Sequence, residues 1–365
     1  MKKKALIIAY NGLSKVGGVQ NVIYQTILSL YTDFDFDIVV FNDDDYYLSK
    51  LKNQGVDCVN RIKISFPKIH KYLGSSFRQC FAYRFAKKLF TKKKYDVVHS
   101  FKELDSWPFL KAASKANVPV RIFHNNVIHS FKGKNILSNI RRFRLRKKSL
   151  KYATVLVAAS KHCGDILYDK KPYNIIYNTY DSSKFYIDTK KSSELSIVQV
   201  GIFCNNKNQL FSIEVFNRIR KITNDCSLIL VGYEAECGYL NEMISAIQNN
   251  GLTDYVKIID GRKVDIENYT KHASCLLIPS YNEGASIVAV EGQACGIPVF
   301  SSTNISDELN CGGLNRIEIN EKESPEIWAR SILTEYKKNG NERKSYDLKK
   351  FSFDSFKAQI SQLYK

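Results

Sequence analysis

Long apolar runs are missing from the sequence, although 44% of its 365 residues are hydrophobic. A helix that crosses a bilayer needs about 20 consecutive apolar residues, so we expect no membrane-spanning segment. The basic start Met1–Lys4 is like that of a signal peptide, but the apolar run after it is short and lacks a small-residue cleavage site. We therefore expect a first strand there instead.

Paired cysteines are also missing. The nine cysteines are odd in number, form no C-x-x-C motif and mostly lie among apolar residues. This pattern indicates reduced thiols in the core of a cytosolic protein. The acidic run Asp43–Asp45 has no second metal-ligand cluster to support it, so we expect a solvated loop and no metal site.

Acidic residues are scarce in the first half of the chain. Residues 1–180 contain 33 Lys and Arg against 12 Asp and Glu, a net charge of +21, whereas residues 181–365 carry −2. The first half is therefore expected to face an anionic partner. The sequence has no zinc-finger spacing, RNP-type strand or helix-turn-helix signature, which disfavours nucleic acid. An anionic membrane surface and a lipid diphosphate remain as candidates.

Two segments carry much of the positive charge. Residues 71–94 interleave aromatic and basic side chains, and residues 141–148 hold six Arg and Lys in eight positions. A basic amphipathic helix of this kind can lie on an anionic bilayer, although such aromatics also serve as core residues and such charges as a solvated face.

Segments of strand length and helix length alternate along the whole chain, which predicts an α/β fold with parallel sheets and helices on both faces. The first strand, Ala5–Ala9, leads through a loop ending in Gly17 and Gly18 into a helix, as in a Rossmann-like half. The spacing is not G-x-G-x-x-G, and no acidic residue ends the second strand. We therefore expect no nicotinamide or flavin.

Residues 277–299 predict a compact strand, loop, helix, turn and strand. The helix should run from about Ala285 to Cys295, with Gly296 as its left-handed cap. Glu283 and Glu291 would then lie about 12 Å apart along the axis, a span that suits a sugar diphosphate nucleotide. One carboxylate could bind sugar hydroxyls and the other ribose, with helix-start N–H groups facing the diphosphate. A plain loop charge and a solvated helix residue are the alternative.

The run from Glu283 and Gly284 to Glu291, followed by Gly-Gln-Ala-Cys-Gly-Ile-Pro-Val, resembles the E-x7-E region of family 4 retaining glycosyltransferases of the GT-B fold. The resemblance extends over nearly the whole chain. It implies two Rossmann-like domains whose parallel sheets face each other across a cleft. Residues 1–180 would bind the acceptor and residues 181–350 the nucleotide sugar, while a C-terminal helix at about 351–365 would pack back on the first domain.

The resemblance also implies roles for individual residues. His124 matches a histidine that contacts the transferred sugar, Lys207 a lysine on the diphosphate, and Glu283 a carboxylate on the sugar. Glu291 would bind ribose. The remaining positions expected to contact the donor are Gly17, Gly18, Gly201, Arg262, Gly284, Ala285 and Ser286.

Three positions depart from the family pattern. Ile202 stands in place of the arginine that accompanies the lysine on the diphosphate. Thr179 replaces a glycine, and Asn126 replaces a second histidine found in many relatives.

The activity that the resemblance implies is retaining and metal-independent transfer of a hexose or N-acetylhexosamine, without a cofactor, from a UDP- or GDP-sugar. The acceptor would be a lipid diphosphate-linked saccharide at the inner face of a bacterial membrane, in capsule, exopolysaccharide or O-antigen synthesis. Ile202 and Thr179 leave a non-catalytic GT-B subunit as an alternative, and the charge alone leaves an anion- or nucleic-acid-binding protein. Donor hydrolysis distinguishes the first two, and a salt-dependent gel shift tests the third.

Overall fold

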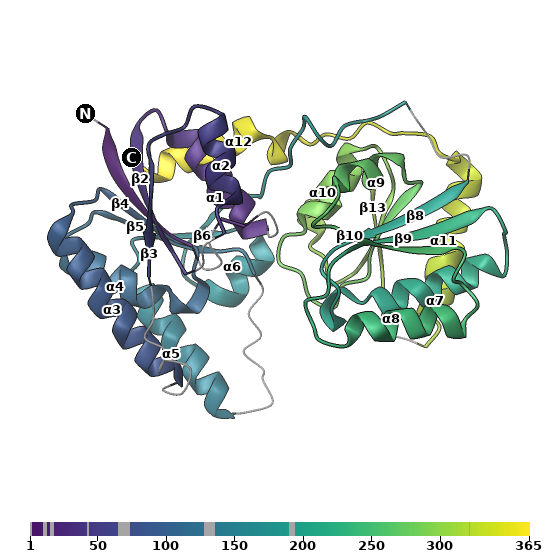
Figure 1. Cartoon of the computed structure of the whole chain (residues 1–365), viewed down its shortest axis with the longest axis horizontal. Coiled ribbons are helices and arrows are strands. Elements are labelled where there is room, and N and C mark those ends of the chain that lie inside the picture. The colour runs from purple at the N-terminus through teal and green to yellow at the C-terminus, as the bar shows by residue number, and fades with distance from the viewer. Residues whose placement is uncertain are drawn as a thin grey trace. The chain divides into compact units, whose positions relative to one another are not determined.

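The chain forms two compact units in the computed structural model, which describes residues 2–9, 13–14, 18–41, 44–64, 74–127, 136–189, 194–320 and 322–365. The first unit contains Met1–Thr179 and Phe353–Lys365, and the second contains Tyr180–Ser352 (Figure 1). Its two boundaries lie one and two residues from those expected from the sequence.

The first unit is built on a seven-stranded sheet in the order β3-β2-β1-β4-β5-β6-β7, and every pairing in it is parallel. The strand order reverses between β1 and β4, as in a Rossmann fold. Its strands are β1 (Lys3–Ile8), β2 (Phe34–Val40), β3 (Val59–Lys63), β4 (Val97–Ser100), β5 (Val120–Asn125), β6 (Val155–Ala158) and β7 (Asn174–Ile175).

Helices cover both faces of this sheet, and successive strand residues feed two separate cores because side chains alternate across a strand. One core combines the sheet with α1 (Gly18–Leu30), α2 (Tyr46–Asn53) and α12 (Phe353–Leu363). The other combines it with α3 (Gly74–Lys92), α4 (Trp107–Lys115), α5 (Ile136–Tyr152) and α6 (Lys161–Tyr168). A short 3-10 helix, η2 (Glu103–Ser106), follows β4.

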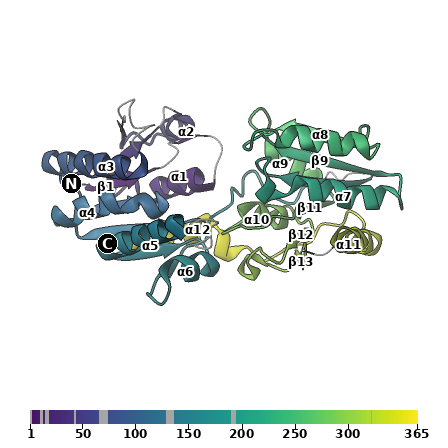
Figure 2. The same ribbon diagram turned by 90° about the horizontal axis from the view of Figure 1, so that it is seen from below.

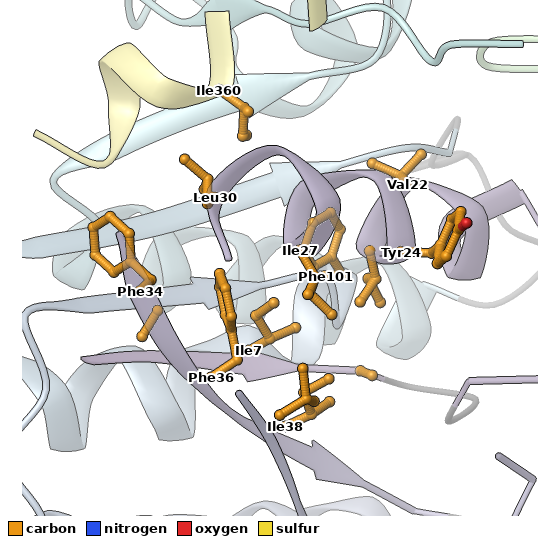
Figure 3. Packing of buried hydrophobic residues seen from close by; sticks show 14 of the residues in the cluster. Ile7, Val22, Tyr24, Ile27, Leu30, Phe34, Phe36, Ile38, Phe101 and Ile360 are labelled. Carbon is orange, nitrogen blue, oxygen red and sulfur yellow. The ribbon is translucent and has the colours of Figure 1, made fainter. Parts of the chain in front are cut away.

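Helix α12 joins the first unit although it is the last helix of the chain. Its buried Phe356 and Ile360 belong to the same core as α1, and Figure 3 shows Ile360 above Leu30. Tyr364, which follows the helix, is 2% exposed and meets the ring of Phe34 edge-on at 5.2 Å. The C-terminus is therefore part of the core of the first unit.

The second unit repeats the plan with a six-stranded parallel sheet in the order β10-β9-β8-β11-β12-β13. The strand order reverses here between β8 and β11. Its strands are β8 (Leu195–Val200), β9 (Cys226–Gly232), β10 (Val256–Asp260), β11 (Cys275–Ile278), β12 (Val299–Ser302) and β13 (Leu314–Ile317).

Three helices of the second unit share one hydrophobic core with the sheet: α7 (Gln209–Arg220), α8 (Tyr239–Asn249) and α11 (Ser324–Asn339). Trp328 is fully buried in it. Helices α9 (Ile266–His272) and α10 (Ile287–Ala294) contact the central strands as well, and Figure 2 shows α10 beside β11 and β12. Short 3-10 helices are η3 (Asn205–Lys207), η4 (Asp307–Leu309) and η5 (Lys349–Phe351).

Three sequence-based expectations about the whole chain can be compared with the structure. The α/β architecture of two Rossmann-like units with parallel sheets is confirmed. In the described part of the chain, no helix combines the length and the apolar content that crossing a bilayer requires. None of the nine cysteines forms a disulfide, but only four of them are buried, so the expectation that most of them are core residues was too broad.

Candidate active site

The second unit presents two loops at the point where its strand order reverses. Strands β8 and β11 are parallel neighbours, so both carboxyl ends lie at the same edge of the sheet. The chain leaves them toward opposite sides, and in open parallel sheets ligands bind beside such a reversal of strand order. The loops concerned are residues 201–208 and 279–286.

Hydrogen bonds join these two loops. The backbone N–H of Tyr281 donates to the carbonyl of Asn206 at 2.9 Å, and the Asn206 side chain donates to the carbonyl of Asn282 at 2.8 Å. Asn208 has a left-handed backbone, with φ of 56°, a conformation that asparagine tolerates better than most residues. The two loops therefore hold each other in one arrangement.

Lys207 and Glu283 form an ion pair between the loops, with 2.8 Å between Nζ and Oε1. Their side chains are 21% and 13% exposed. Burial is the largest single influence and would raise the pKa of Glu283, but the Lys207 ammonium and the hydroxyls of Ser286 and Ser280 together outweigh it. The pKa of Glu283 therefore falls below its usual value, and the carboxylate is ionised at neutral pH.

The second oxygen of this carboxylate remains available. Oε2 of Glu283 is buried and has no hydrogen bond of good geometry within the described residues, although the two serine hydroxyls are close enough to favour its charge. The ammonium of Lys207 has three N–H donors, and one of them is directed at Glu283. The pair therefore offers both an acceptor and donors to a ligand.

Glu291 is in the opposite state. It lies in α10, and its pKa is raised to about 8, first by burial and then by the negative charges of Glu267 and Asp181. Lys184 opposes the shift but is bound to Glu267 at 2.6 Å. Glu291 is therefore protonated at neutral pH, while Glu283 is ionised.

Helix α10 begins two residues later than expected. It spans Ile287–Ala294, and Ser286 at its N-terminal boundary makes no side-chain capping bond. Gly284, Ala285 and Ser286 thus belong to the loop that precedes the helix. At the other end Gly296 has φ of +72°, as expected, and an added Cβ would lie 2.9 Å from the carbonyl oxygen of Lys344.

Gly232, which the sequence analysis did not single out, allows the backbone to pack closely at this edge of the sheet. An added Cβ on Gly232, at the end of β9, would lie 1.9 Å from the carbonyl oxygen of Gly201. Only glycine permits this approach of β9 to the loop after β8. The Val-Gly-Tyr that ends this strand was the available signal.

Arg262, at the end of β10, directs its guanidinium to Asp260 through bonds of 2.9 and 2.8 Å and lies 5.2 Å from the ring of Tyr233. The guanidinium of Arg262 is therefore already bound within the second unit.

In the first unit the structure places the expected residues differently from the sequence analysis. Gly18 begins α1, and Gly17 lies outside the described residues. The apolar run Val118–Phe123 predicts a strand that ends just before His124, but His124 lies inside β5 and is 1% exposed. The strand extends to Asn125 because its register with β6 continues that far.

His124 has a partner that the sequence analysis missed. Its Nδ1 lies 3.1 Å from Nε2 of His99 on β4, and the two rings are stacked at 5.2 Å. The Asp-Val-Val-His of residues 96–99, which supplies most of β4, was the signal, since β4 and β5 are neighbours in a parallel sheet. Burial lowers the pKa of His124 to about 3, so the imidazole is neutral at physiological pH.

Residues 16–184 match the protein family described as "Glycosyltransferase Family 4". Residues 183–347 match the family described as "Glycosyl transferases group 1". The sequence is 26% identical to the putative glycosyltransferase EpsF of Bacillus subtilis over 65% of each chain, slightly under two thirds of that protein. It is 29% identical to the capsular polysaccharide biosynthesis glycosyltransferase CapH of Staphylococcus aureus, over 69% of this chain and 72% of CapH. The fold is similar to that of Anabaena HepE, solved with UDP-glucose, with a TM-score of 0.77, 16% identity and 98% coverage of both chains.

We expect Lys207→Met to lower the unfolding free energy of the second unit by about 1–3 kcal/mol at pH 7, because it leaves the Glu283 carboxylate without its counter-charge. The loss should shrink below pH 4.5, the usual pKa of the group, where protonation removes the uncompensated charge. Urea unfolding followed by Trp328 fluorescence in a Trp107→Phe background measures it, since these are the two tryptophans.

Adding Glu283→Gln to Lys207→Met should recover most of the loss. Arg262→Met is the matched control: it breaks an ion pair whose arginine is 58% exposed, and such pairs contribute about 0–1 kcal/mol. A double variant as unstable as Lys207→Met alone would show that the ion pair is not the cause.

Proposed function

The chain belongs to the family 4 glycosyltransferases of the GT-B fold, and from this we propose that it is a retaining, metal-independent hexosyltransferase. It would move a hexose or N-acetylhexosamine from a nucleotide diphosphate sugar to a lipid diphosphate-linked saccharide, in the synthesis of a bacterial surface polysaccharide. The name of CapH supports this setting, the name of EpsF supports a glycosyltransferase, and the UDP-glucose bound to HepE supports the donor class.

The observation that carries the proposal is the Lys207–Glu283 pair at the strand-order reversal of the second unit. A nucleotide sugar presents hydroxyls on its hexose and negative charge on its diphosphate. The ionised Glu283 suits the hydroxyls, and the remaining N–H donors of Lys207 suit the diphosphate. Both groups of the pair thus meet the chemistry of one ligand.

The other donor contacts follow from this position. The loop N–H groups of Ala285 and Ser286 lie at the same sheet edge and suit phosphate oxygens. The N–H of Gly201 donates to the carbonyl of Val231 at 2.9 Å, so Gly201 would contribute a close approach of the backbone to the donor. The backbone at Gly261 and Arg262 would contact the nucleobase, and Glu291 would bind the ribose hydroxyls. In the first unit, Gly18 and His124 would act on the acceptor side and on the transferred sugar.

The reaction that these groups support needs no covalent enzyme intermediate. An acceptor oxygen forms a bond to the anomeric carbon on the face from which the diphosphate leaves, the carbon–oxygen bond to phosphate breaks, and the hydroxyl proton passes to the departing phosphate oxygen. Lys207 neutralises the developing charge, while Glu283 and His124 hold the sugar in place.

Ile202 favours a second candidate, a non-catalytic GT-B subunit that assists a partner transferase. Within residues 201–208, Lys207 is the only cationic side chain, whereas relatives place an arginine at the position of Ile202. A lone lysine is a point charge and lacks the bidentate geometry of arginine.

Transfer assays decide between the two candidates. Thermal-shift screening of UDP- and GDP-sugars identifies the donor, and turnover is then measured with excess EDTA present. We expect retained turnover in EDTA, a product with the anomeric configuration of the donor by NMR, and a drop in kcat of about 10²–10³-fold in Lys207→Met. A protein that binds a donor but neither hydrolyses nor transfers it fits the subunit candidate instead.

The first unit offers a surface for an anionic membrane on α5. Four apolar side chains of this helix are exposed, with exposed fractions from 43% to 76%: Ile136, Leu137, Ile140 and Phe143. The basic side chains of residues 141–148 lie among them, and Nζ of Lys147 is 4.6 Å from the Phe143 ring centre. Apolar and cationic groups on one helix end suit the interface of an anionic bilayer.

The other basic segment suits this role less well. On α3, Phe81, Tyr83, Phe85 and Phe90 pack against the core of the first unit. The aromatic side of α3 is therefore used within the protein, and α5 is the surface that we assign to the membrane. A peripheral position at the inner face of the membrane would bring the protein to its lipid-linked acceptor.

Glu291 provides a pH test of the ribose contact. Hydrogen bonds from ribose hydroxyls favour the carboxylate, so donor binding at pH 7 should release close to one proton from a group whose pKa is about 8. Donor affinity should therefore rise with pH up to about 8 and level off above it. Calorimetry in buffers of different ionisation enthalpy measures the proton count.

Glu291→Gln should abolish this proton release and weaken donor binding. Glu242→Gln, an exposed carboxylate on α8, is the control and should behave like the wild type. Unchanged proton release and donor affinity in Glu291→Gln would rule out the ribose contact.

Flotation with vesicles tests the membrane surface. The protein should float with vesicles of phosphatidylglycerol and phosphatidylcholine in equal parts, and less so in 0.5 M salt, because about 1 kcal/mol per basic residue is screened. Replacing Ile140 and Phe143 by Ser should lower the bound fraction further. Ile222→Ser, at a site 55% exposed in the second unit, is the control. Equal binding to pure phosphatidylcholine would contradict the assignment.

A further inference from the structure

Three buried polar side chains form a continuous line in the first unit. The hydroxyl of Tyr364 lies 2.8 Å from Nδ1 of His99, and Nε2 of His99 lies 3.1 Å from Nδ1 of His124. None of the three residues is more than 2% exposed. The line begins beyond α12 at the C-terminus and ends on β5, at the histidine assigned above to the transferred sugar.

Aromatic neighbours hold the rings in this order. Phe101 stacks on His99 at 4.1 Å, and its ring centre is 4.8 Å from that of His124. Phe34 meets the ring of Tyr364 edge-on. Because apolar rings cover their faces, the imidazoles can hydrogen-bond only through the nitrogens in the ring plane. Three of these four nitrogens meet a neighbour within the line.

All three groups are neutral. Burial lowers the pKa of His99 well below its usual value, with a smaller contribution from His124, and burial raises the pKa of Tyr364. Each imidazole therefore carries one N–H, and the tyrosine keeps its O–H proton. Only two arrangements of these protons satisfy both hydrogen bonds.

In the first arrangement the Tyr364 hydroxyl donates to His99 Nδ1, and His99 Nε2–H donates to His124 Nδ1. The proton of His124 is then on Nε2. In the second arrangement both bonds are reversed: His99 donates from Nδ1 to the tyrosine oxygen, and His124 donates from Nδ1 to His99. The proton of His124 then lies within the line, and its Nε2 is a bare acceptor.

The two arrangements differ in what they leave unsatisfied. The Tyr364 hydroxyl has no second partner among the described residues, so in the second arrangement its own proton is buried without an acceptor. A buried unsatisfied donor costs about 1–3 kcal/mol. The first arrangement leaves only one such group, the Nε2–H donor of His124, which has no hydrogen-bond partner within the described residues. The second arrangement leaves two, the O–H of Tyr364 and the bare Nε2 of His124.

We propose that Tyr364 is a positioning residue that fixes both histidines as Nε2–H tautomers, so that His124 presents an N–H donor to its ligand. The ligand atom it suits is an oxygen with a free lone pair, such as a hydroxyl oxygen of the transferred sugar or a diphosphate oxygen. The hydrogen-bonding character of a sugar-binding histidine is thus set by the C-terminus. This inference rests on the proposed function of His124, but the tautomers can be measured without any substrate.

The first test is the ¹⁵N spectrum of the full-length wild-type protein labelled in histidine. Long-range ¹H–¹⁵N correlation distinguishes a protonated ring nitrogen from a bare one. We expect His99 and His124 both to carry their proton on Nε2 from pH 6 to 8, with His99→Gln and His124→Gln used to assign the signals. A proton on Nδ1 of either residue would overturn the proposal, whatever the enzyme transfers.

The second test is Tyr364→Phe, which removes the hydroxyl and keeps the ring. Without its donor, Nδ1 of His99 should move in ¹⁵N shift, and the Nδ1–H tautomer of both histidines should become populated. We expect kcat to fall by about 3- to 10-fold, the equivalent of one hydrogen bond, and the calorimetric Kd for free nucleotide to stay within about twofold of the wild type.

Tyr168→Phe is the matched control. Tyr168 is also buried in the first unit, but its hydroxyl donates to the carbonyls of Phe123 and Val157. Its removal should lower stability and leave the histidine tautomers and kcat unchanged. Folded Tyr364→Phe with wild-type histidine signals and wild-type kcat would refute the proposal. If the tautomers shift in Tyr364→Phe but the wild-type protein transfers no sugar, the role of Tyr364 is supported and the proposed function is refuted instead.

Discussion

Parallel strand pairing with one reversal of strand order is the constraint on which both units depend. Because all strands of a sheet run the same way, their carboxyl ends lie at one edge of that sheet. The reversal of strand order between β8 and β11 separates the loops that follow these two strands. Lys207 and Glu283 are 76 positions apart in the sequence, yet they are brought to 2.8 Å by this geometry. The reversal between β1 and β4 gives the first unit the same plan.

Glu283 and Glu291 lie in one short segment but differ in protonation state. Glu283 is close to a lysine and two serine hydroxyls, so it stays ionised despite its burial. Glu291 has Glu267 and Asp181 as neighbours, whose negative charges raise its pKa further than burial alone does, so Glu291 keeps its proton. One segment thus offers a charged acceptor and a neutral acid. Desolvation acts on both, and the sign of the nearest charge decides the outcome.

The last helix shows how a chain end can enter the interior of an early domain. Phe356 and Ile360 bury their side chains against the sheet and α1, which places Tyr364 next to His99. That hydrogen bond joins residues 265 positions apart. The tautomeric state of the buried histidines therefore depends on the packing of α12, because this packing brings the tyrosine hydroxyl to the imidazole.

The sequence by itself determined the two Rossmann-like units, their parallel sheets and the loop containing Glu283, because periodicity, glycines and caps act over a few residues. It also singled out Lys207, Glu283, Glu291 and His124. Tertiary structure alone decided that His124 lies within a strand, that His99 and Tyr364 are its partners, and that Glu283 and Glu291 differ in protonation. Hydrogen-bond partners and pKa values depend on groups that folding brings together from distant positions, and no local pattern records them.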